Sequence, residues 1–447
     1  MTGFLDLFGT LFFAMASLII SVVASAHIVL RKRDTRAAIG WVGVVWLAPF
    51  IGAMLYLMLG INRIQRRASR LRGTEMHPRP ADGQVQRDAV SLPPEAVHLS
   101  SLAALGRMVT QAELCEGNSV SPLVGGEAAY GEMIAAIDAA KESVAVASYI
   151  FDHDQAGLMF ANALERAIHR GLEIRVLIDG LGAYYSWPQI TKTLHARGII
   201  CAKFMHSILP WRMAYLNLRS HRKLVIVDGR IGFTGGMNIR AGHLANSGVR
   251  RLIQDVHFRI DGPVVTQLAS TFEDDWRFTT GERLAGPKWF PKLNAEDGAG
   301  RMAARVIVDG PDREFDRLNQ ILMGAVSQAV NSVRIVTPYF LPDRPLLSAL
   351  TLAALKGVKI DIVIPRVSNL PLVQWATWAQ LGQILQVGAA VWLSPPPFDH
   401  SKIMTVDRVW SFIGSTNWDT RSLRLNFELS VEIYDTALAG RLNELID

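Results

Sequence analysis

Hydrophobic positions fall into two kinds of segment along residues 120–447. The sequence SVAVASYIF at 143–151 is a continuous apolar run with the length of a buried strand. Residues 157–171 then place apolar side chains at helical spacing and end at a glycine, and 172–180 form a second apolar run. Strands that alternate with helices in this way predict an α/β fold with a largely parallel sheet.

The same order of elements returns in the last third of the chain. The segment SVRIVTPYFLPD at 332–343 corresponds to SVAVASYIFDHD at 143–154. The distance between the copies is that of a domain and not of a solenoid repeat. We therefore expect two related α/β halves, residues 120–300 and 301–447, with one shared site at their pseudo-twofold interface.

Two uncharged apolar stretches precede these halves. Residues 7–26 and 37–60 contain no Asp, Glu, Lys or Arg, and each reaches the roughly 20 residues that span a bilayer core. We therefore predict a membrane hairpin of two transmembrane helices within residues 1–62, with Pro49 tolerated in the second helix. A single span followed by a buried or interfacial helix is the alternative.

Residues 63–119 combine several prolines with many charges and little periodicity. This composition predicts a linker, with one short helix near 100–112.

The charge distribution fits a protein that works at a membrane. The net charge is +6, which in a chain with membrane spans indicates anionic lipid as the partner, and not nucleic acid. Basic residues flank the second apolar stretch on both sides, so the positive-inside rule does not choose an orientation for a hairpin. The two cysteines, Cys115 and Cys201, show no metal or disulfide spacing, as expected for a cytoplasmic catalytic part.

Each half contains a strand that begins with His-x-Lys. His221 and Lys223 stand in RSHRKLVIVDG, and His400 and Lys402 stand in the related FDHSKIMTVDR. Residues i and i+2 of a strand share a face, so each histidine is expected beside its lysine. One such pair is typical of an ordinary surface strand. Two pairs in matching contexts predict a paired catalytic site.

Further polar residues follow both strands at the same spacing. Asp228 and Asp407 come seven residues after the histidines, and Asn238 and Asn417 end the sequences GGMN and GSTN. Glycine follows Asp228, which predicts a hairpin turn. The aspartates belong to the motif and so to the predicted catalytic set, although we expect them to brace the turns.

These residue types suit the exchange of a phosphodiester. Lysines and asparagines supply donors for phosphate oxygens, a neutral histidine can attack phosphorus, and a second histidine can protonate the leaving oxygen. No metal is expected, because each lysine would place an ammonium group beside the dication. Asp255 and Glu428, on a later strand of each half, are candidates to hold the second ring nitrogen of the histidines.

The duplicated motif resembles the phospholipase D superfamily and, within it, the bacterial cardiolipin synthases. The similarity runs from about residue 117 to 447 and is carried by segments such as LRSHRKLVIVDGRIGFTGGMNI, HSKIMTVD, GSTNWDTRS and LNFEL. It implies two homologous phospholipase D-like α/β sandwich halves with a shared active site, preceded by the two transmembrane helices.

The resemblance also implies a reaction. Two phosphatidylglycerol molecules would give cardiolipin and glycerol without a cofactor, with His221 as the nucleophile that forms a phosphohistidine and His400 as acid and base. Hydrolysis to phosphatidic acid by the same residues and a phosphatidylethanolamine donor are alternatives. The segment NIRAGHL after the first motif is less acidic than is usual in the family, which bears on the head group. The implied location is the bacterial inner membrane, multi-pass, with the catalytic part on the cytoplasmic side. The oligomeric state stays open.

Overall fold

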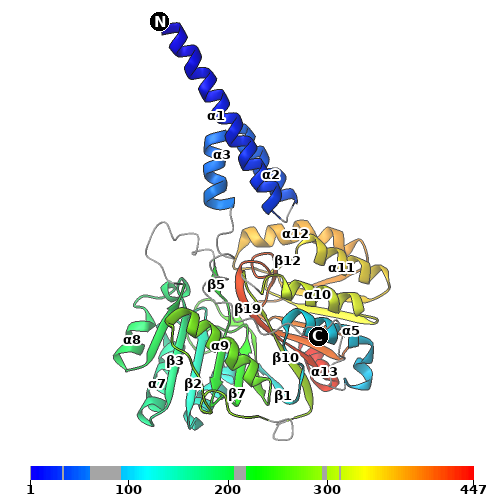
Figure 1. Cartoon of the computed structure of the whole chain (residues 1–447). Coiled ribbons are helices and arrows are strands. Elements are labelled where there is room, and N and C mark those ends of the chain that lie inside the picture. Colours follow the sequence, from blue (N-terminus) through cyan, green and yellow to red (C-terminus); the bar gives the residue numbers. More distant parts are fainter. Residues whose placement is uncertain (1, 33–34, 61–91, 206–217, 294–299, 312–313) are drawn as a thin grey trace. The chain divides into compact units, whose positions relative to one another are not determined.

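Two parts of the chain fold separately in the computed structural model, Met1–Leu71 and Arg72–Asp447 (Figure 1). The first contains both apolar stretches and the second contains both predicted halves. The structure describes residues 2–32, 35–60, 92–205, 218–293, 300–311 and 314–447.

The first half folds as its sequence pattern predicts. β2 (Ser143–Ser148) and β3 (Glu173–Asp179) pair in parallel and are joined by α7 (Gln155–His169). Asp154 begins this helix, because its carboxylate accepts a hydrogen bond from the backbone N–H of Gly157 at 3.1 Å. Every residue of β2 is buried, as expected for a strand covered on both faces.

The second half repeats this unit. β11 (Ser332–Val336) and β13 (Lys359–Pro365) pair in parallel and are joined by α11 (Arg344–Leu355). Asp343 begins α11 in the way that Asp154 begins α7, with a hydrogen bond to a backbone N–H of the first turn. The prediction of two homologous halves is confirmed.

One mixed sheet runs through both halves. Its strand order is β14-β13-β11-β16-β17-β19-β10-β1-β9-β7-β6-β2-β3-β4, and the pairs are parallel only towards its two ends. The expectation of a largely parallel sheet is wrong, because each His-x-Lys strand returns through a tight hairpin and not through a helical crossover. These hairpins are β6 (Leu224–Val227) with β7 (Ile231–Gly235), and β16 (Ile403–Val406) with β17 (Trp410–Gly414).

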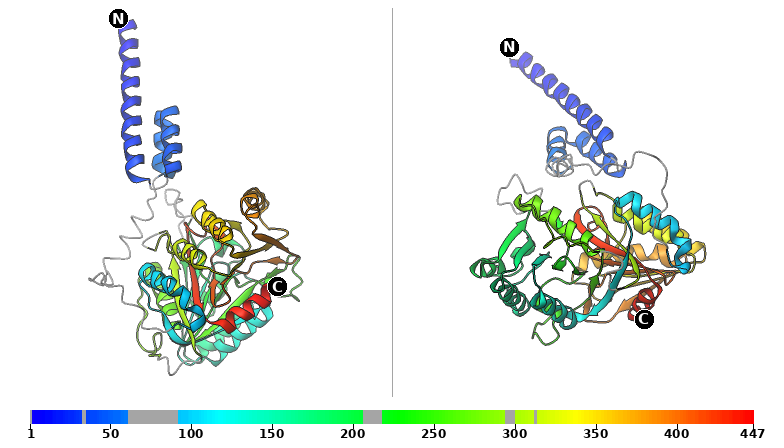
Figure 2. Two further views of the ribbon diagram at one scale, coloured as in Figure 1. Left: turned by 90° about the vertical axis from the view of Figure 1, so that its right-hand side faces the viewer. Right: turned by 60° about the horizontal axis from the view of Figure 1, so that its bottom comes forward.

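Helices cover the sheet, as the two views of Figure 2 show. The halves meet where the central strands β1 and β10 pair in antiparallel fashion. The remaining strands of the sheet are β1 (Cys115–Val124), β4 (Ile200–Phe204), β9 (Val256–Asp261), β10 (Met302–Asp309), β14 (Ala390–Ser394) and β19 (Asn426–Tyr434). The remaining helices of this part with seven or more residues are α5 (Ser100–Thr110), α6 (Gly125–Ala139), α8 (Ile190–Ala196), α9 (Val265–Thr280), α10 (Arg317–Gln328), α12 (Pro371–Leu385) and α13 (Thr436–Ile446).

Part of the predicted linker is folded onto the second half. α5 is the short helix expected near 100–112, and Leu99 and Leu102 are fully buried in one apolar cluster with Ile307 and Leu322 of the second half. This stretch is therefore not a linker, because its apolar side chains complete a core. Residues 63–91 of the predicted linker lie outside the described residues.

The first apolar stretch forms one long helix. α1 (Thr2–Arg31) includes Gly9–Arg31, which among the described residues is the one segment long and apolar enough to cross a membrane.

The second apolar stretch is divided. α2 (Thr35–Leu47) is followed by the non-helical residue Ala48. α3 (Pro49–Leu55) then continues into the short π-helix Tyr56–Gly60. Neither helical piece has the length of a membrane span, so the prediction of two transmembrane helices is not confirmed.

Candidate active site

Each histidine follows a short strand that pairs with the opposite half. β5 (Arg219–Ser220) runs parallel to the start of β19, and β15 (Phe398–Asp399) runs parallel to β8 (Ile253–Gln254). The next residue along each strand continues the pairing: the His221 N–H donates to the Phe427 carbonyl at 2.9 Å, and the His400 N–H donates to the Gln254 carbonyl at 2.7 Å. The two halves therefore exchange strands on either side of the site.

This exchange brings each histidine ring to a carboxylate of the other half. His221 Nδ1 lies 3.1 Å from Glu428 Oε2 and 3.2 Å from the Ser415 carbonyl oxygen. His400 Nδ1 lies 3.0 Å from Asp255 Oδ2. These acceptors favour the tautomer with hydrogen on Nδ1, which leaves the lone pair on Nε2. The sequence identified both carboxylates, but it did not indicate that they cross between halves.

Glu428 lies in a fully buried cluster of donors. Its carboxylate accepts hydrogen bonds from Ser415 Oγ at 2.5 Å, from Asn426 Nδ2 at 3.1 Å and from Ser422 Oγ. Burial alone would raise the pKa of Glu428, but His221, Lys223 and the Ser415 hydroxyl outweigh it and the net pKa is lowered. Glu428 is therefore ionised. Neither serine was predicted from the sequence, although both stand in the GSTNWDTRS segment.

Asp255 has fewer donors around it. Its carboxylate accepts the N–H of Val256 at 2.8 Å in addition to the His400 ring. Burial raises the pKa of Asp255 well above its ordinary value, with Lys402 opposing the shift. The two histidine–carboxylate pairs thus share one geometry, but the pKa shifts of their carboxylates run in opposite directions.

Gly236 allows Asp255 to lie where it does. A Cβ atom at this position would come within 2.5 Å of both carboxylate oxygens and within 2.7 Å of the His400 carbonyl oxygen. The equivalent residue of the second half is Ser415, whose hydroxyl instead donates to Glu428. The second residue of each motif therefore suits its carboxylate: the glycine of Gly-Gly leaves room for Asp255, and the serine of Gly-Ser donates to Glu428.

Both histidine rings are poised as neutral bases. Burial lowers the pKa of His221, against the opposing charge of Glu428. Burial, followed by the lysine charges, lowers the pKa of His400 well below its ordinary value. At neutral pH each ring therefore presents an unprotonated Nε2, which can attack an electrophile or accept a proton.

The two lysines lie under the histidines. Each Nζ donates to the carbonyl oxygen of its own histidine at 2.5 Å, and both side chains are buried. Burial lowers the pKa of Lys223 to about 7 and that of Lys402 to about 8. Neither lysine is among the described residues that line the pocket; each has further N–H groups beyond the one that its histidine carbonyl accepts.

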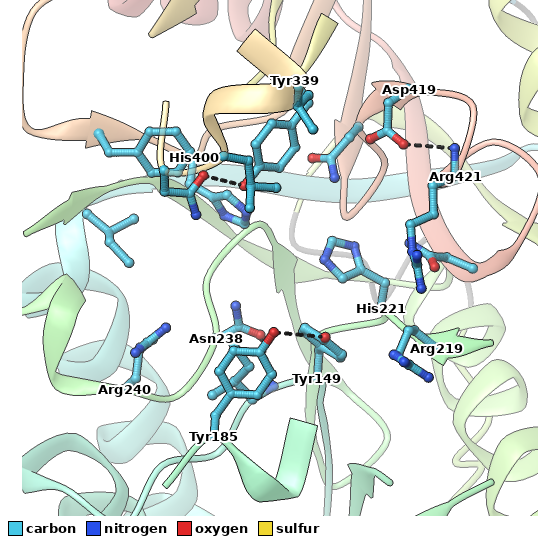
Figure 3. Close-up of a pocket in the computed structure, with 18 of the residues that line it drawn as sticks. Tyr149, Tyr185, Arg219, His221, Asn238, Arg240, Tyr339, His400, Asp419 and Arg421 are labelled. Atoms are coloured by element: carbon cyan, nitrogen blue, oxygen red, sulfur yellow. Dashed lines mark hydrogen bonds between the residues drawn. The ribbon is translucent and has the colours of Figure 1, made fainter. Parts of the chain in front are cut away.

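His221 and His400 line one pocket with a volume of about 420 Å³ (Figure 3). Tyr149 packs beside His221 with ring centroids 5.3 Å apart, and Tyr339 lies beside His400 at 6.5 Å. Three cationic side chains also line the pocket: Arg219, Arg240 and Arg421. The pocket therefore combines two bases, aromatic walls and positive charge, which suits an anionic phosphodiester.

The predicted asparagines lie in this pocket as well. Asn238 Oδ1 accepts the Ile150 N–H at 3.1 Å, so its NH₂ group is left to donate. Asn417 occupies the equivalent place in the second half, and its buried Oδ1 has no hydrogen-bond partner among the described residues. Both amides can contact a bound phosphate or alcohol.

The motif aspartates do not line the pocket. Asp228 and Asp407 lie at the far ends of their strands in left-handed conformations, with φ of 52° and 51°. Their carboxylates accept backbone N–H groups from the start of β2 and of β11, and Asp407 also contacts His98 Nε2 at 2.8 Å. The two aspartates therefore brace the turns, as expected. They lie apart from the histidines, although all four residues belong to one sequence motif.

Comparison with known proteins identifies the family. The family model described as cardiolipin synthase, PLD-like domain, matches residues 133–276 and 322–447, and the model described as phospholipase D-nuclease N-terminal matches 19–60. The major cardiolipin synthase ClsA of Bacillus subtilis (strain 168) is 30% identical over 443 residues, covering 97% of this chain and 90% of that protein. The cardiolipin synthase of Geobacillus thermodenitrificans (strain NG80-2) is 29% identical over 432 residues, covering 94% and 84%.

A solved structure shows a similar fold. The phosphatidylserine synthase of Haemophilus influenzae Rd KW20 superposes with a TM-score of 0.57 at 14% identity, covering 77% of this chain and 89% of that one. With the family models and the relatives along nearly the whole sequence, the chain belongs to the cardiolipin synthase family of phospholipase D-like proteins.

Proposed function

We propose that this chain is a cardiolipin synthase that transfers the phosphatidyl group of one phosphatidylglycerol to the terminal hydroxyl of another and releases glycerol. One observation carries the proposal: His221 and His400 face one pocket, and each has Nδ1 held by a carboxylate and Nε2 available. This is the arrangement that a two-step displacement at phosphorus needs. Membership of the cardiolipin synthase family supports the same activity.

In the first step, His221 Nε2 attacks the phosphorus of the first lipid. The bond between phosphorus and the glycerol head-group oxygen breaks, and His400 donates its Nε2 proton to that oxygen. His400 takes up this proton from water when the anionic phosphodiester binds, because the adjacent negative charge raises the pKa of the histidine. Glycerol leaves, and a phosphohistidine remains.

In the second step, the terminal hydroxyl of another phosphatidylglycerol attacks the phosphorus. His400 Nε2 takes the proton of this hydroxyl, and the bond between phosphorus and His221 Nε2 breaks. Cardiolipin is released and both histidines return to their initial state. One phosphodiester is exchanged for another, so the reaction consumes no nucleotide.

The unequal carboxylates support the choice of His221 as the nucleophile. A phosphorylated histidine carries positive charge on its ring, and the ionised Glu428 at Nδ1 would stabilise that charge. The partner of His400 is Asp255, whose raised pKa gives the His400 ring weaker support for a lasting positive charge. His400 is then the residue that exchanges protons.

The donors around the histidines suit the developing charge on the phosphoryl oxygens. Asn238 and Asn417 line the pocket, and the amino groups of Lys223 and Lys402 donate to the histidine carbonyls. A bound anionic phosphate favours the protonated form of both lysines. Fixed donors of this kind stabilise a transition state without reorganisation. We assign the four side chains to the bound phosphate.

We further propose that the enzyme works at the bacterial inner membrane with its catalytic part in the cytoplasm. The apolar helix α1 and the match to the N-terminal family model support membrane association. Cys115 and Cys201 are both free thiols, the form expected in a reducing compartment. An anchored enzyme would take both substrates from the lipid phase, where an alcohol competes better with water.

A product assay tests this function. Full-length protein would be given phosphatidylglycerol labelled in its glycerol head group and its phosphate, alone and mixed with phosphatidylethanolamine. Cardiolipin with an equal amount of released glycerol is the expected result. Phosphatidic acid as the sole product would show hydrolysis and refute the transferase, and release of ethanolamine would identify a second donor.

Trapping of the intermediate tests the roles of the histidines. Acid-labile, base-stable phosphate on the protein is expected in the wild type and absent in His221→Ala. His195→Ala is a matched control, because this exposed histidine contacts only the Cys201 carbonyl in the described structure and should leave activity unchanged. A phosphorylated protein in His221→Ala but not in His400→Ala would reverse the assignment.

A further inference from the structure

The second apolar stretch turns back on itself at Ala48. This residue has φ of −143° and ψ of 79°, and Pro49 begins the next helix. Gly52 lies so close to α2 that a Cβ atom would come within 2.4 Å of the Val44 carbonyl oxygen. In an uninterrupted helix, residues 44 and 52 would be separated by about 12 Å along the axis.

Aromatic contacts fix the direction of the return. Trp41 in α2 and Tyr56 after α3 have ring centroids 5.6 Å apart, although an uninterrupted helix would separate these residues by about 22 Å. Phe50 packs on Phe13 at 5.8 Å, and Tyr56 OH lies 2.9 Å from Nδ1 of His27. α3 therefore runs antiparallel to α2. It begins beside Phe13 of α1 and ends beside His27, near the Arg31 end of α1 where α2 begins (Figure 1).

The two arms of this turn, α2 and α3 with its π-helical end, are each too short to cross a bilayer. α2 has 13 residues, and α3 with its π-helical end has 7 and 5, so each arm reaches about 18–20 Å into a hydrocarbon core of about 30 Å.

The chemistry of the arms nevertheless suits lipid. Leu47 and Ile51 near the turn are 89% and 63% exposed. The backbone at the turn is internally bonded, since Ala48 N–H donates to Val44 O at 3.1 Å and Gly52 N–H donates to Ala48 O at 2.6 Å. Satisfied backbone groups and apolar side chains are what a turn at membrane depth requires.

This geometry changes the meaning of the flanking charges. Arg31, Lys32, Arg33 and Arg36 precede the second stretch, and a further cluster follows it: Arg63, Arg66, Arg67, Arg70 and Arg72. In a two-span hairpin these clusters would lie on opposite faces of the membrane. If the stretch returns, they lie on the same face. The positive-inside rule then gives a single orientation.

We propose that residues 35–60 form a re-entrant hairpin, inserted among the acyl chains of one leaflet and returning to the face that it entered. α1 is then the single crossing among the described residues, with the N-terminus outside the cytoplasm. Residues 61–91 contain no apolar run of spanning length, so the catalytic halves follow the basic clusters into the cytoplasm. The proposal rests on the inner-membrane location proposed above and replaces the multi-pass topology predicted from the sequence.

Thiol labelling tests the topology. In full-length protein carrying Cys115→Ser and Cys201→Ser, single cysteines would be placed by Thr2→Cys, Thr35→Cys or Asn62→Cys. A membrane-impermeant maleimide would be applied to spheroplasts and to inverted membrane vesicles. Positions 35 and 62 are expected to react only in inverted vesicles, and position 2 only in spheroplasts.

Each other pattern overturns part of the proposal. Labelling of positions 35 and 62 from opposite faces would show a two-span hairpin and refute the re-entrant turn. Labelling of both from outside would refute the orientation. The readout is independent of lipid products, so a failure of the proposed reaction would leave the topology result interpretable, and the converse also holds.

A pair of glycine variants locates the cause of the return. Gly52→Leu would force a side chain into the Val44 carbonyl, and part of the label at position 62 is expected to appear on the outer face. Gly43→Leu is the matched control, because a Cβ atom there meets nothing within 4 Å, and labelling should not change. Equal behaviour of the two variants would show that the close approach of α3 to α2 does not hold the hairpin.

Discussion

Glu428 and Asp255 hold their histidines through the same contact in unequal surroundings. Glu428 accepts hydrogen bonds from two serine hydroxyls and is ionised, whereas burial keeps the pKa of Asp255 high. At this scale the site is asymmetric even though the motif is repeated. The asymmetry is the physical basis for giving the two histidines different roles.

Removal of either carboxylate should reduce turnover while the fold is kept. In Glu428→Gln and Asp255→Asn the amide can no longer hold the ring tautomer and its charge, and losses of about 10²- to 10⁴-fold in kcat are expected. Glu428→Gln also removes the charge that opposes the burial effect on His221. The pKa of His221 then falls further, and the acidic limb of the kcat/KM profile should move to lower pH.

Cardiolipin formation measured across a range of pH tests this expectation. Asp261→Asn is a suitable control, because this residue lies on the strand that follows Asp255 and pairs with Arg259 away from the pocket. Near-normal turnover in both carboxylate variants would contradict the positioning role. A loss of rate in Glu428→Gln without movement of the acidic limb would indicate a structural effect alone.

The reacting residues could be found from the sequence because they recur at fixed spacing. Two copies of His-x-Lys with a later asparagine identified His221, His400, Asn238 and Asn417 without a structure. Asp255 and Glu428 were candidates from the sequence, but which of them holds which histidine could not be found in this way, because a contact across more than a hundred residues leaves no local pattern. Ser415, which donates to Glu428 from only 13 residues away, was not recognised from the sequence either.

Gly236, directly after β7, packs against the carboxylate of Asp255, which orients His400. Gly236→Ala should displace Asp255 and the His400 backbone, because the added methyl group would meet both. A misplacement of about 1 Å can cost about 100-fold in rate, and a loss of this size in kcat is expected. Turnover and circular dichroism measured together would separate misplacement from unfolding.

Gly242→Ala provides the comparison for this variant. It lies in the same loop region, but a Cβ atom there makes contacts of 3.4 Å or more. Retained activity in Gly242→Ala together with loss in Gly236→Ala is the expected pair of results. Equal activity in both would show that the room at Gly236 has no catalytic role.

At the scale of elements, apolar runs predicted the strands and helices of both halves but not their directions. Direction depends on whether a hairpin or a crossover follows, and the hairpins at Asp228 and Asp407 made most of the central sheet antiparallel. Apolar length likewise indicated two membrane spans. The break at Ala48 could not be read from hydropathy, because a lipid-facing turn and a lipid-facing helix have the same apolar composition.

Arg222 links the two halves of the molecule. It is fully buried between His221 and Lys223, donates to both carboxylate oxygens of Asp275 at 2.7 Å, and also reaches the Glu428 carbonyl at 3.2 Å. Arg222→Met would leave Asp275 buried without its cation, and a loss of about 3–5 kcal/mol in the free energy of unfolding is expected. Urea unfolding followed by tryptophan fluorescence measures it.

Two further variants test this link. The double variant Arg222→Met with Asp275→Leu should recover most of the lost stability, because Asp275 is no longer a buried charge without its cation, and Glu314, which also pairs with Arg222, keeps its pair with Arg317. Arg166→Ala removes an exposed pair with Asp138 and should cost less than about 1 kcal/mol. A single variant Arg222→Met as stable as Arg166→Ala would contradict the proposed link.

The exchange of strands around the pocket has a consequence for the origin of the chain. A protein made of one half alone would carry one histidine and one carboxylate that do not contact each other, because each histidine pairs with the carboxylate of the other half. Two identical copies related by a twofold axis would complete both pairs at once. Joining the copies into one polypeptide preserves every contact and releases the two sites from identity. Gene duplication and fusion thereby allow one pair to have a glutamate and the other an aspartate. Two histidines that derive from one ancestral histidine could then take different roles, one in attack and one in proton transfer.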